Sequence, residues 1–137
     1  MRRIVLVACG KRKGNSRAKA RYLYQGELFQ KSLAYAQSLE RVAIYILSAK
    51  HGLLDLDTEI DPYDQTLKKM KIAGVKVWAQ HVLEQLRCVA NLREDQFTFL
   101  AADRYRRYLL PHLAYYDVPM EGLGIGKQLH FLTQRTV

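Results

Sequence analysis

The sequence predicts an α/β protein: one domain, residues 1–137, with a three-layer, Rossmann-like fold and a mainly parallel sheet of about four strands. Short apolar runs, typical of buried strands, alternate with longer stretches in which apolar residues recur at helical spacing. Strands that alternate with helices form βαβ units, whose strands are parallel and whose helices cover both faces of the sheet. A chain of 137 residues is the size of one domain, and we find no internal repeat or linker.

The first part of the chain predicts two strands with a helix between them. Residues 4–8 are an unbroken apolar run, as expected of a strand buried on both faces. Residues 14–21 are polar and predict a loop, and the apolar residues of 27–39 have helical spacing. Residues 42–47 form the second run that is rich in β-branched and aromatic side chains.

The second part predicts the remaining elements with less regular patterns. They are an ordered loop at 53–66, a helix over 67–86 with Gly74 as its weak point, a strand at 97–101, a helix over 105–113, a short strand at 115–118 and a last helix that runs to Phe131. We therefore expect the third strand at 97–101 and the fourth at 115–118.

The positive charge of the chain is concentrated near its N-terminus. Lys and Arg number 22 against 13 Asp and Glu, which gives a net charge of +9. No acid precedes Glu27, whereas these basic residues do: Arg2, Arg3, Lys11, Arg12, Lys13, Arg17, Lys19 and Arg21. Such a field favours nucleic acid and other phosphate-bearing partners, and a solubilising surface is the alternative.

Hydropathy and cysteine usage favour a cytoplasmic protein. No stretch approaches the ~20 apolar residues of a membrane-spanning helix, and the apolar run after Arg3 is too short for a secretory signal. Cys9 and Cys88 form no C-x-x-C motif and have no histidine cluster nearby. This argues against a disulfide framework and against a structural zinc site.

The least core-like residues of the chain follow the predicted strands. Because ligands bind outside the carboxyl ends of parallel strands, we expect these residues to surround one basic crevice. They are Cys9, Gly10, Lys11 and Lys13 after the first strand; Ser48, Lys50, His51 and Gly52 after the second; Asp103 after the third; and Glu121, Gly122 and Gly124 before the last helix.

The segment after the first strand combines a thiol, glycines and lysines. Glycine lets a backbone approach phosphate, and lysines supply charge around it, although a basic surface turn has the same composition. The segment is not a Walker loop, because Gly10 is followed by Lys11-Arg-Lys-Gly14. A thiol beside lysines is a candidate nucleophile, and a buried structural cysteine is the alternative.

The segment after the second strand contains Lys50 and His51, neither of which continues an apolar strand. His51 is a candidate general acid or phosphate ligand and Lys50 a candidate anion ligand. A histidine that bonds a loop carbonyl is the alternative. Asp103 and Glu121 are carboxylates that could stabilise an oxocarbenium ion or activate water, and Asp103 could instead cap the following helix.

An acidic loop and a glycine-rich segment are two further candidate ligand sites in the sequence. The acidic loop from Asp55 to Asp64 fails the EF-hand pattern, so turn formation and capping near Thr66 explain it, while Tyr63 is a candidate stacking platform for a base. Gly122-x-Gly124-x-Gly126 lacks the dinucleotide-binding spacing, so we expect no dinucleotide cofactor. Because the acidic loop also fails the EF-hand pattern, we assign no metal ligands.

Taken together, these motifs resemble a bacterial and phage protein family with no assigned function. The resemblance rests on Cys9-Gly-Lys-Arg-Lys13, Leu28-Phe29, Ser48-Ala-Lys-His-Gly-Leu53, Pro62-Tyr-Asp-x-Thr-Leu67 and Glu121-Gly-Leu-Gly-Ile-Gly126. That family is distantly similar to the catalytic region of archaeosine synthase, whose Pro-Cys-x3-Lys-Pro-Tyr pattern matches Cys9-x3-Lys13 here. It is more loosely similar to the peroxide-stress protein YaaA. Ala8 and Gly14-Asn15 depart from that pattern. The resemblance implies a context of modified bases, tRNA or DNA.

These observations support an enzyme that acts on a nucleobase, in nucleic acid or in a nucleotide, by base modification or N-glycosidic chemistry. In this hypothesis Cys9, His51, Asp103 and Glu121 are reactive, and lysines hold phosphate. The alternatives are a non-catalytic DNA- or RNA-binding module and a small-nucleotide sensor.

Overall fold

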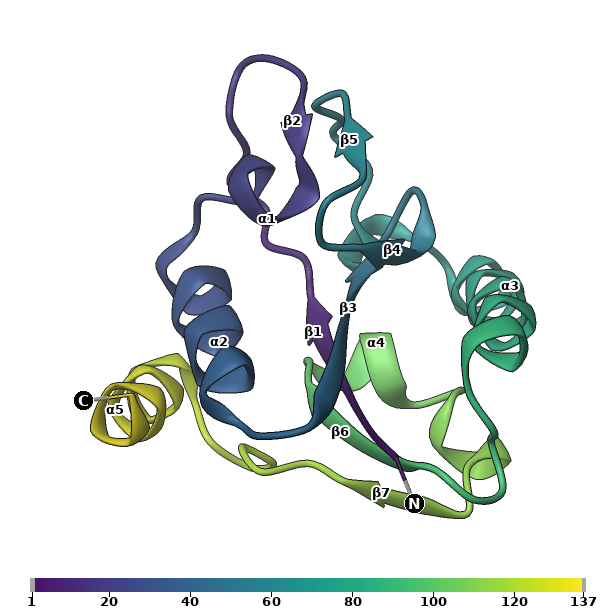
Figure 1. Cartoon of the computed structure of the whole chain (residues 1–137). Coiled ribbons are helices and arrows are strands. Elements are labelled where there is room, and N and C mark those ends of the chain that lie inside the picture. Colours follow the sequence, from purple (N-terminus) through teal and green to yellow (C-terminus); the bar gives the residue numbers. More distant parts are fainter. Residues whose placement is uncertain (1, 137) are drawn as a thin grey trace.

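The structure is a computed structural model that describes residues 2–136, and its centre is a five-stranded sheet (Figure 1). The strands are β1 (Arg3–Ala8), β3 (Val42–Ser48), β4 (Gly52–Asp55), β6 (Gln96–Leu100) and β7 (Tyr115–Asp117), in the order β4-β3-β1-β6-β7. All neighbours are parallel except β4, which is antiparallel to β3. The prediction of an α/β fold with a mainly parallel sheet is confirmed at this level.

Helices lie on both faces of this sheet (Figure 1). They are α1 (Ala20–Leu23), α2 (Glu27–Ser38), α3 (Ile72–Val89), α4 (Asp103–Arg106) and α5 (Ile125–Arg135), with 3₁₀ turns η1 (Leu67–Lys69) and η2 (Leu110–His112). Successive residues of a strand point to opposite faces. Val5 and Val7 therefore pack on the side of α2 and α5, whereas Ile4 and Leu6 pack on the side of α3.

The predicted loops contain three strands that the sequence patterns did not indicate. Residues 53–66 were expected to be a loop, but Gly52 has φ of +71°, and the chain turns back there so that β4 pairs with β3. The loop expected at 14–21 holds β2 (Ala18–Lys19), which pairs with β5 (Glu59–Ile60) as a separate two-stranded ribbon. Two-residue strands are too short to show an alternating pattern.

Two predicted helices are shorter than expected. The helix expected over 67–86 is interrupted because Met70 and Lys71 are extended. Arg104 donates hydrogen bonds to the carbonyls of Leu67 and Met70, which lie at this interruption. The helix expected over 105–113 begins at Asp103 and ends after one turn, before a 3₁₀ turn that contains Pro111, which has no N–H to continue a helix.

The strand order reverses next to β1. The chain passes from β1 to β3 on one side, and later returns to β6 on the other side of β1. The carboxyl ends of β1 and β6 therefore form the point at which a ligand crevice is expected in such a sheet. Within residues 2–136, no helix has the length and apolar character that crossing a membrane requires.

Candidate functional site

A hollow lies directly after β1, at the reversal of strand order, and we name it the Cys9 hollow. Its volume is about 270 Å³. Its walls are Cys9, Gly10, Lys11 and Lys13 from the loop after β1, Asp64, Gln65, Thr66 and Lys69 from the segment around η1, and Tyr105 of α4. The backbone N–H of Cys9 donates to the carbonyl of Leu47 at 2.9 Å, so a hydrogen bond to the sheet fixes the backbone position of Cys9.

The thiol of Cys9 meets the phenol of Tyr105 across the reversal point. Cys9 Sγ lies 3.6 Å from Tyr105 Oη, and either atom can be the donor. The ring of Trp78 packs edge-on against Tyr105, with 5.6 Å between centroids. Burial, and then the proximity of Cys9, raise the pKa of Tyr105 above its ordinary value. Tyr105 is therefore a neutral hydroxyl that can donate a hydrogen bond within the hollow.

A second group of hydroxyls lies behind the hollow. Tyr63 Oη is 2.7 Å from Ser48 Oγ and 2.5 Å from Tyr24 Oη, and Tyr24 Oη is 3.4 Å from Ser48 Oγ. We name these three side chains the hydroxyl triangle. Burial, followed by the nearby Cys9, raises the pKa of Tyr24 to about 12 and that of Tyr63 further. The triangle thus joins three segments through neutral groups.

Two lysines lie over the ring of Tyr63. Lys13 Nζ is 4.4 Å from the ring centroid and Lys50 Nζ is 5.9 Å from it, distances at which a cation is attracted to an aromatic ring. An antiparallel β-bridge to Tyr24 positions the backbone of Lys13, and its Nζ donates a hydrogen bond to the carbonyl of Lys11. Tyr63 does not line the Cys9 hollow, and its contact with Lys13 leaves less of the ring for a stacked base.

His51 lies beside the same ring. Its backbone N–H donates to Ser48 Oγ at 3.1 Å, and its imidazole packs edge-on against Tyr63 with 5.6 Å between centroids. Partial burial, and then the charge of Lys50, lower the pKa of His51 below 6.5. Its imidazole is therefore neutral at pH 7 and could accept a proton.

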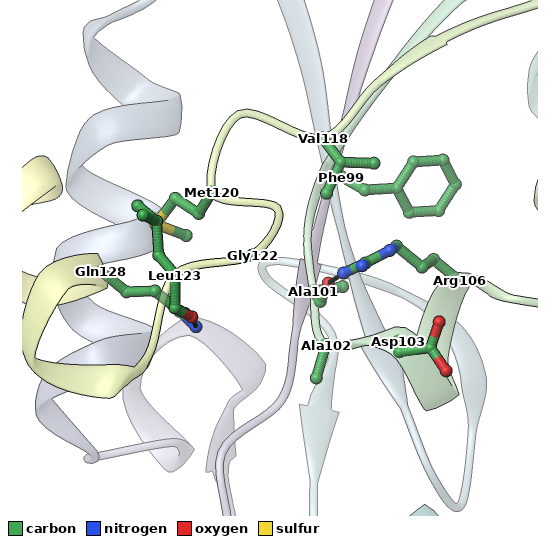
Figure 2. Close-up of a pocket in the computed structure, with 10 residues that line it drawn as sticks. All are labelled: Phe99, Ala101, Ala102, Asp103, Arg106, Val118, Met120, Gly122, Leu123 and Gln128. Atoms are coloured by element: carbon green, nitrogen blue, oxygen red, sulfur yellow. Dashed lines mark hydrogen bonds between the residues drawn. The ribbon is translucent and has the colours of Figure 1, made fainter.

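A second hollow lies at the ends of β6 and β7, and we name it the Asp103 hollow (Figure 2). Its volume is about 220 Å³. It is lined by Phe99, Ala101, Ala102, Asp103, Arg106, Val118, Met120, Gly122, Leu123 and Gln128. Arg106 donates to the carbonyl of Ala101 at 2.6 Å and Gln128 to that of Leu123 at 2.8 Å, so both polar side chains are held in place. Figure 2 shows the guanidinium of Arg106 directed across the hollow.

Asp103 makes a different contact from the helix cap considered in the sequence. It is the first residue of α4, with Ala102 at the capping position, and its carboxylate pairs with Arg107 at 2.6 Å. That carboxylate raises the pKa of the exposed Arg107 guanidinium. Capping near Thr66 is confirmed, because Thr66 Oγ1 accepts from the N–H of Lys68.

The structure divides the predicted site residues between these two hollows. Cys9, Gly10, Lys11 and Lys13 line the first, and Asp103 and Gly122 line the second. Ser48, Lys50, His51 and Tyr63 are connected to the first hollow through the hydroxyl triangle and its lysines. Gly52 forms the turn into β4, and Glu121 and Gly124 are exposed and line neither hollow. Cys9 and Asp103 therefore do not share one hollow.

Sequence reasoning missed several residues of the site. Lys69, Thr66 and Gln65 line the Cys9 hollow although they follow no strand, and Tyr24 is fully buried within a segment that was expected to precede a helix. Arg106 of the Asp103 hollow was also not among the predicted site residues. The sequence signal for this segment was the motif at 62–67, Pro-Tyr-Asp-x-Thr-Leu. Its polar residues are of types that form side-chain hydrogen bonds, which are uncommon in a plain linker.

The acidic loop from Asp55 to Asp64 pairs with a basic arm that consists of residues 17–23 and includes β2 and α1. Arg17 lies 3.2 Å from Asp61, and Arg21 lies 2.8 Å from Asp57. In the part of the chain that the structure describes, no three or more His, Cys, Asp or Glu side chains form a group that could hold a metal. The charge of this arm is thus partly neutralised, whereas Lys11, Lys13, Lys50 and Lys69 have no ion pair among residues 2–136.

Comparison with known proteins gives one match. A family model described as "Family of unknown function (DUF6884)" matches residues 4–134. No curated protein and no solved structure matches the chain. The match spans both hollows and the hydroxyl triangle.

Proposed function

The chain belongs to the DUF6884 family of unknown function, and we propose that it is an enzyme that acts on a nucleobase and holds phosphate in the Cys9 hollow. The observation that carries this proposal is the convergence of Lys11, Lys13 and Lys69 on a hollow that also contains a thiol. Lysine binds phosphate as a point charge. Among residues 2–136, Asp64 is the one carboxylate on the wall of this hollow, so the cations outnumber the acids there.

The Asp103 hollow is proposed to receive the base. Met120 and Leu123 provide apolar surface, and Arg106 and Gln128 provide polar groups already held by backbone carbonyls. Ligand sites commonly combine apolar walls with a few fixed polar groups. Asp103 would stabilise positive charge that develops on the sugar if the N-glycosidic bond breaks.

The reactive group of the first hollow is proposed to be Cys9. The thiol of Cys9 lies 3.6 Å from the neutral phenol of Tyr105 in a hollow lined by lysines, which makes it the candidate nucleophile. The phenol of Tyr105 can donate a hydrogen bond to an oxygen or nitrogen of the substrate. His51, with a lowered pKa, is a base candidate beside Tyr63. Glu121 is the weakest member of the predicted set, because it is exposed and outside both hollows.

The finer assignments from the sequence belong to the same proposal. The strand order and the helices on both faces support a Rossmann-like relationship. Cys9 and Lys13, the two positions matched in the archaeosine synthase pattern, line the same hollow, which supports that distant similarity. A cytoplasmic location is included because free thiols persist in that compartment.

Mass spectrometry of nucleosides and free bases tests the enzyme directly. Purified protein is incubated with RNA and DNA that carry natural modifications, and the expected result is a released or altered base. Cys9→Ser, Lys13→Met and Asp103→Asn should each reduce this product. Cys88→Ser and Arg87→Met are the matched controls, because both side chains are exposed on α3. Equal product from all variants would remove the assignment.

The alternative is a non-catalytic nucleic-acid module. The cations that extend beyond the Cys9 hollow favour it, whereas the ion pairs of Arg17 and Arg21 weaken the basic arm as a binding surface. This alternative predicts binding without any product, and equal affinity for wild type and Cys9→Ser.

A further inference from the structure

A group of exposed basic residues lies on η1, at the start of α3 and on α4, and one of them, Lys69, lines the Cys9 hollow. We name it the lysine face, and it consists of Lys68, Lys69, Lys71, Lys76 and Arg104, all of which are exposed. The sequence contains no acid between Asp64 and Glu84. The nearest acid on α4, Asp103, is already paired with Arg107. Asp64 lines the Cys9 hollow together with Lys69 but forms no ion pair with the lysine face among the described residues, so cations outnumber carboxylates there.

Individual contacts join the elements that hold the lysine face. Arg104 donates from Nη1 to the carbonyls of Leu67 and Met70, both at 3.1 Å, and so ties α4 to η1. Lys76 Nζ lies 5.4 Å from the ring centroid of Tyr108, on the segment that follows α4. Lys69 belongs to both surfaces, because it also lines the Cys9 hollow. A ligand in the hollow thus lies at one end of the lysine face.

The cations of the lysine face are unpaired. Of the residues that the structure describes, no Asp or Glu lies within ion-pair distance of these five side chains. By contrast, Arg17, Arg21 and Lys31 each pair with an acid on their own surfaces. An unpaired cluster next to a proposed phosphate site indicates a partner with more negative charge than the hollow alone can hold.

The extent of the face argues for more than one nucleotide. Lys71, the residue before α3, and Lys76 are five residue steps apart, which is about 7.5 Å along the helix axis. One nucleotide advances about 3.4 Å along a duplex strand. A free nucleotide bound in the hollow would leave Lys71 and Lys76 without a phosphate.

We propose that the substrate is a nucleic-acid chain rather than a free nucleotide, and that the lysine face binds the phosphates next to the target nucleotide. This inference rests on the proposed function, since it takes the Cys9 hollow as the place of the target nucleotide's phosphate. The phosphate of the target nucleotide occupies the Cys9 hollow, and the strand on one side of it continues over η1 and the first turns of α3. Contacts of this kind fix the position of a strand and do not read its sequence.

Fluorescence anisotropy at several salt concentrations tests the inference. The probes are a single-stranded oligonucleotide of about 12 nucleotides and a mononucleotide. The variant is the triple substitution Lys68→Met, Lys71→Met and Lys76→Met. The control triple is Arg41→Met, Arg87→Met and Arg93→Met, which removes equal charge from exposed positions next to the amino ends of β3 and β6. Circular dichroism checks that each variant is folded.

We expect the lysine-face variant to lose affinity for the oligonucleotide and to bind the mononucleotide as wild type does. At about 0.7 released counterions per phosphate, three lost contacts reduce the slope of log affinity against log salt by about 2. Between 50 and 200 mM salt, wild type should thus lose about 20-fold more affinity than the variant. The control triple should retain the wild-type slope for the oligonucleotide.

The outcomes separate this inference from the proposed function. If both triples have the same slope and affinity for the oligonucleotide, the lysine face does not bind the strand and the inference is overturned. If polyglutamate of similar length competes as well as the oligonucleotide, the face is a general polyanion surface and the inference is also wrong. If Lys13→Met changes binding of neither probe, the phosphate role of the Cys9 hollow fails, whatever the lysine face does.

Discussion

Replacement of Ser48 by alanine tests whether the hydroxyl triangle stabilises the end of β3. Ser48 is fully buried, and its Oγ accepts a hydrogen bond from the N–H of His51 at 3.1 Å. The same oxygen lies 2.7 Å from Tyr63 Oη and 3.4 Å from Tyr24 Oη. Ser48→Ala removes this oxygen and leaves the two phenols bonded to each other.

The size of the effect follows from these contacts. Each lost hydrogen bond costs about 1 kcal/mol, and a buried donor without an acceptor costs about 1–3 kcal/mol. The Tyr24 contact is long and adds little, so the sum is dominated by the Tyr63 and His51 contacts. We expect the free energy of unfolding to fall by about 2 kcal/mol, which lowers the Tm by about 6–8 °C for a chain of this size.

Urea unfolding, followed by the fluorescence of the single tryptophan and by circular dichroism, measures this change. Ser38→Ala is the control, because Ser38 is exposed and donates only to the carbonyl of Tyr35. The control should change the free energy of unfolding by less than about 0.5 kcal/mol. A Ser48→Ala protein as stable as the control would show that the triangle contributes no net stability.

Three further outcomes are expected. Pyrophosphate at ten times its Kd should slow the alkylation of Cys9 by iodoacetamide about 10-fold and leave the exposed Cys88 unaffected, as read by mass spectrometry; equal rates would place phosphate elsewhere. An NMR titration should give His51 a pKa below 6.5, and Lys50→Met should raise this pKa only in part, since burial is the larger cause. Because the pKa is lowered in the folded state, the free energy of unfolding should fall as the pH drops below about 6.5. A flat stability profile in this range would contradict the prediction. Because burial raises the pKa of Tyr24 from 10 to about 12, its neutral phenol should stabilise the fold fully below pH 10 and lose this effect as the pH rises through 12. Denaturant unfolding at each pH measures this change, and Tyr24→Phe should flatten the dependence of the free energy of unfolding on pH.

Most of the fold follows from local patterns in the sequence. The apolar run at residues 4–8 and the helical spacing after Glu27 correspond to β1 and α2 within one residue at either end. Strand β4 could not be predicted in this way. Its pairing depends on the turn at Gly52, where the side chain of Gln85, from α3, donates to the carbonyls of His51 and Leu53. That interaction joins residues far apart in the chain.

The candidate site was predictable in its parts and not in its grouping. The polar residues after each strand were visible, because polar and glycine-rich segments interrupt apolar runs. Which of them meet was not, since Asp103 and Tyr105 leave the same short helix toward different hollows. Lys69 lines the Cys9 hollow from η1, which Arg104 of α4 bonds at the carbonyls of Leu67 and Met70.

The sequence by itself determined the alternation of strands and helices, the excess of positive charge and the position of reactive residues at strand ends. These are properties of short segments, and apolar periodicity and charge express them directly. Only the tertiary structure decided that Cys9 faces Tyr105, that Lys13 and Lys50 lie over Tyr63, and that Asp103 lies apart. These distances depend on how far the separate segments turn after leaving the sheet, and backbone hydrogen bonds between distant residues set that course.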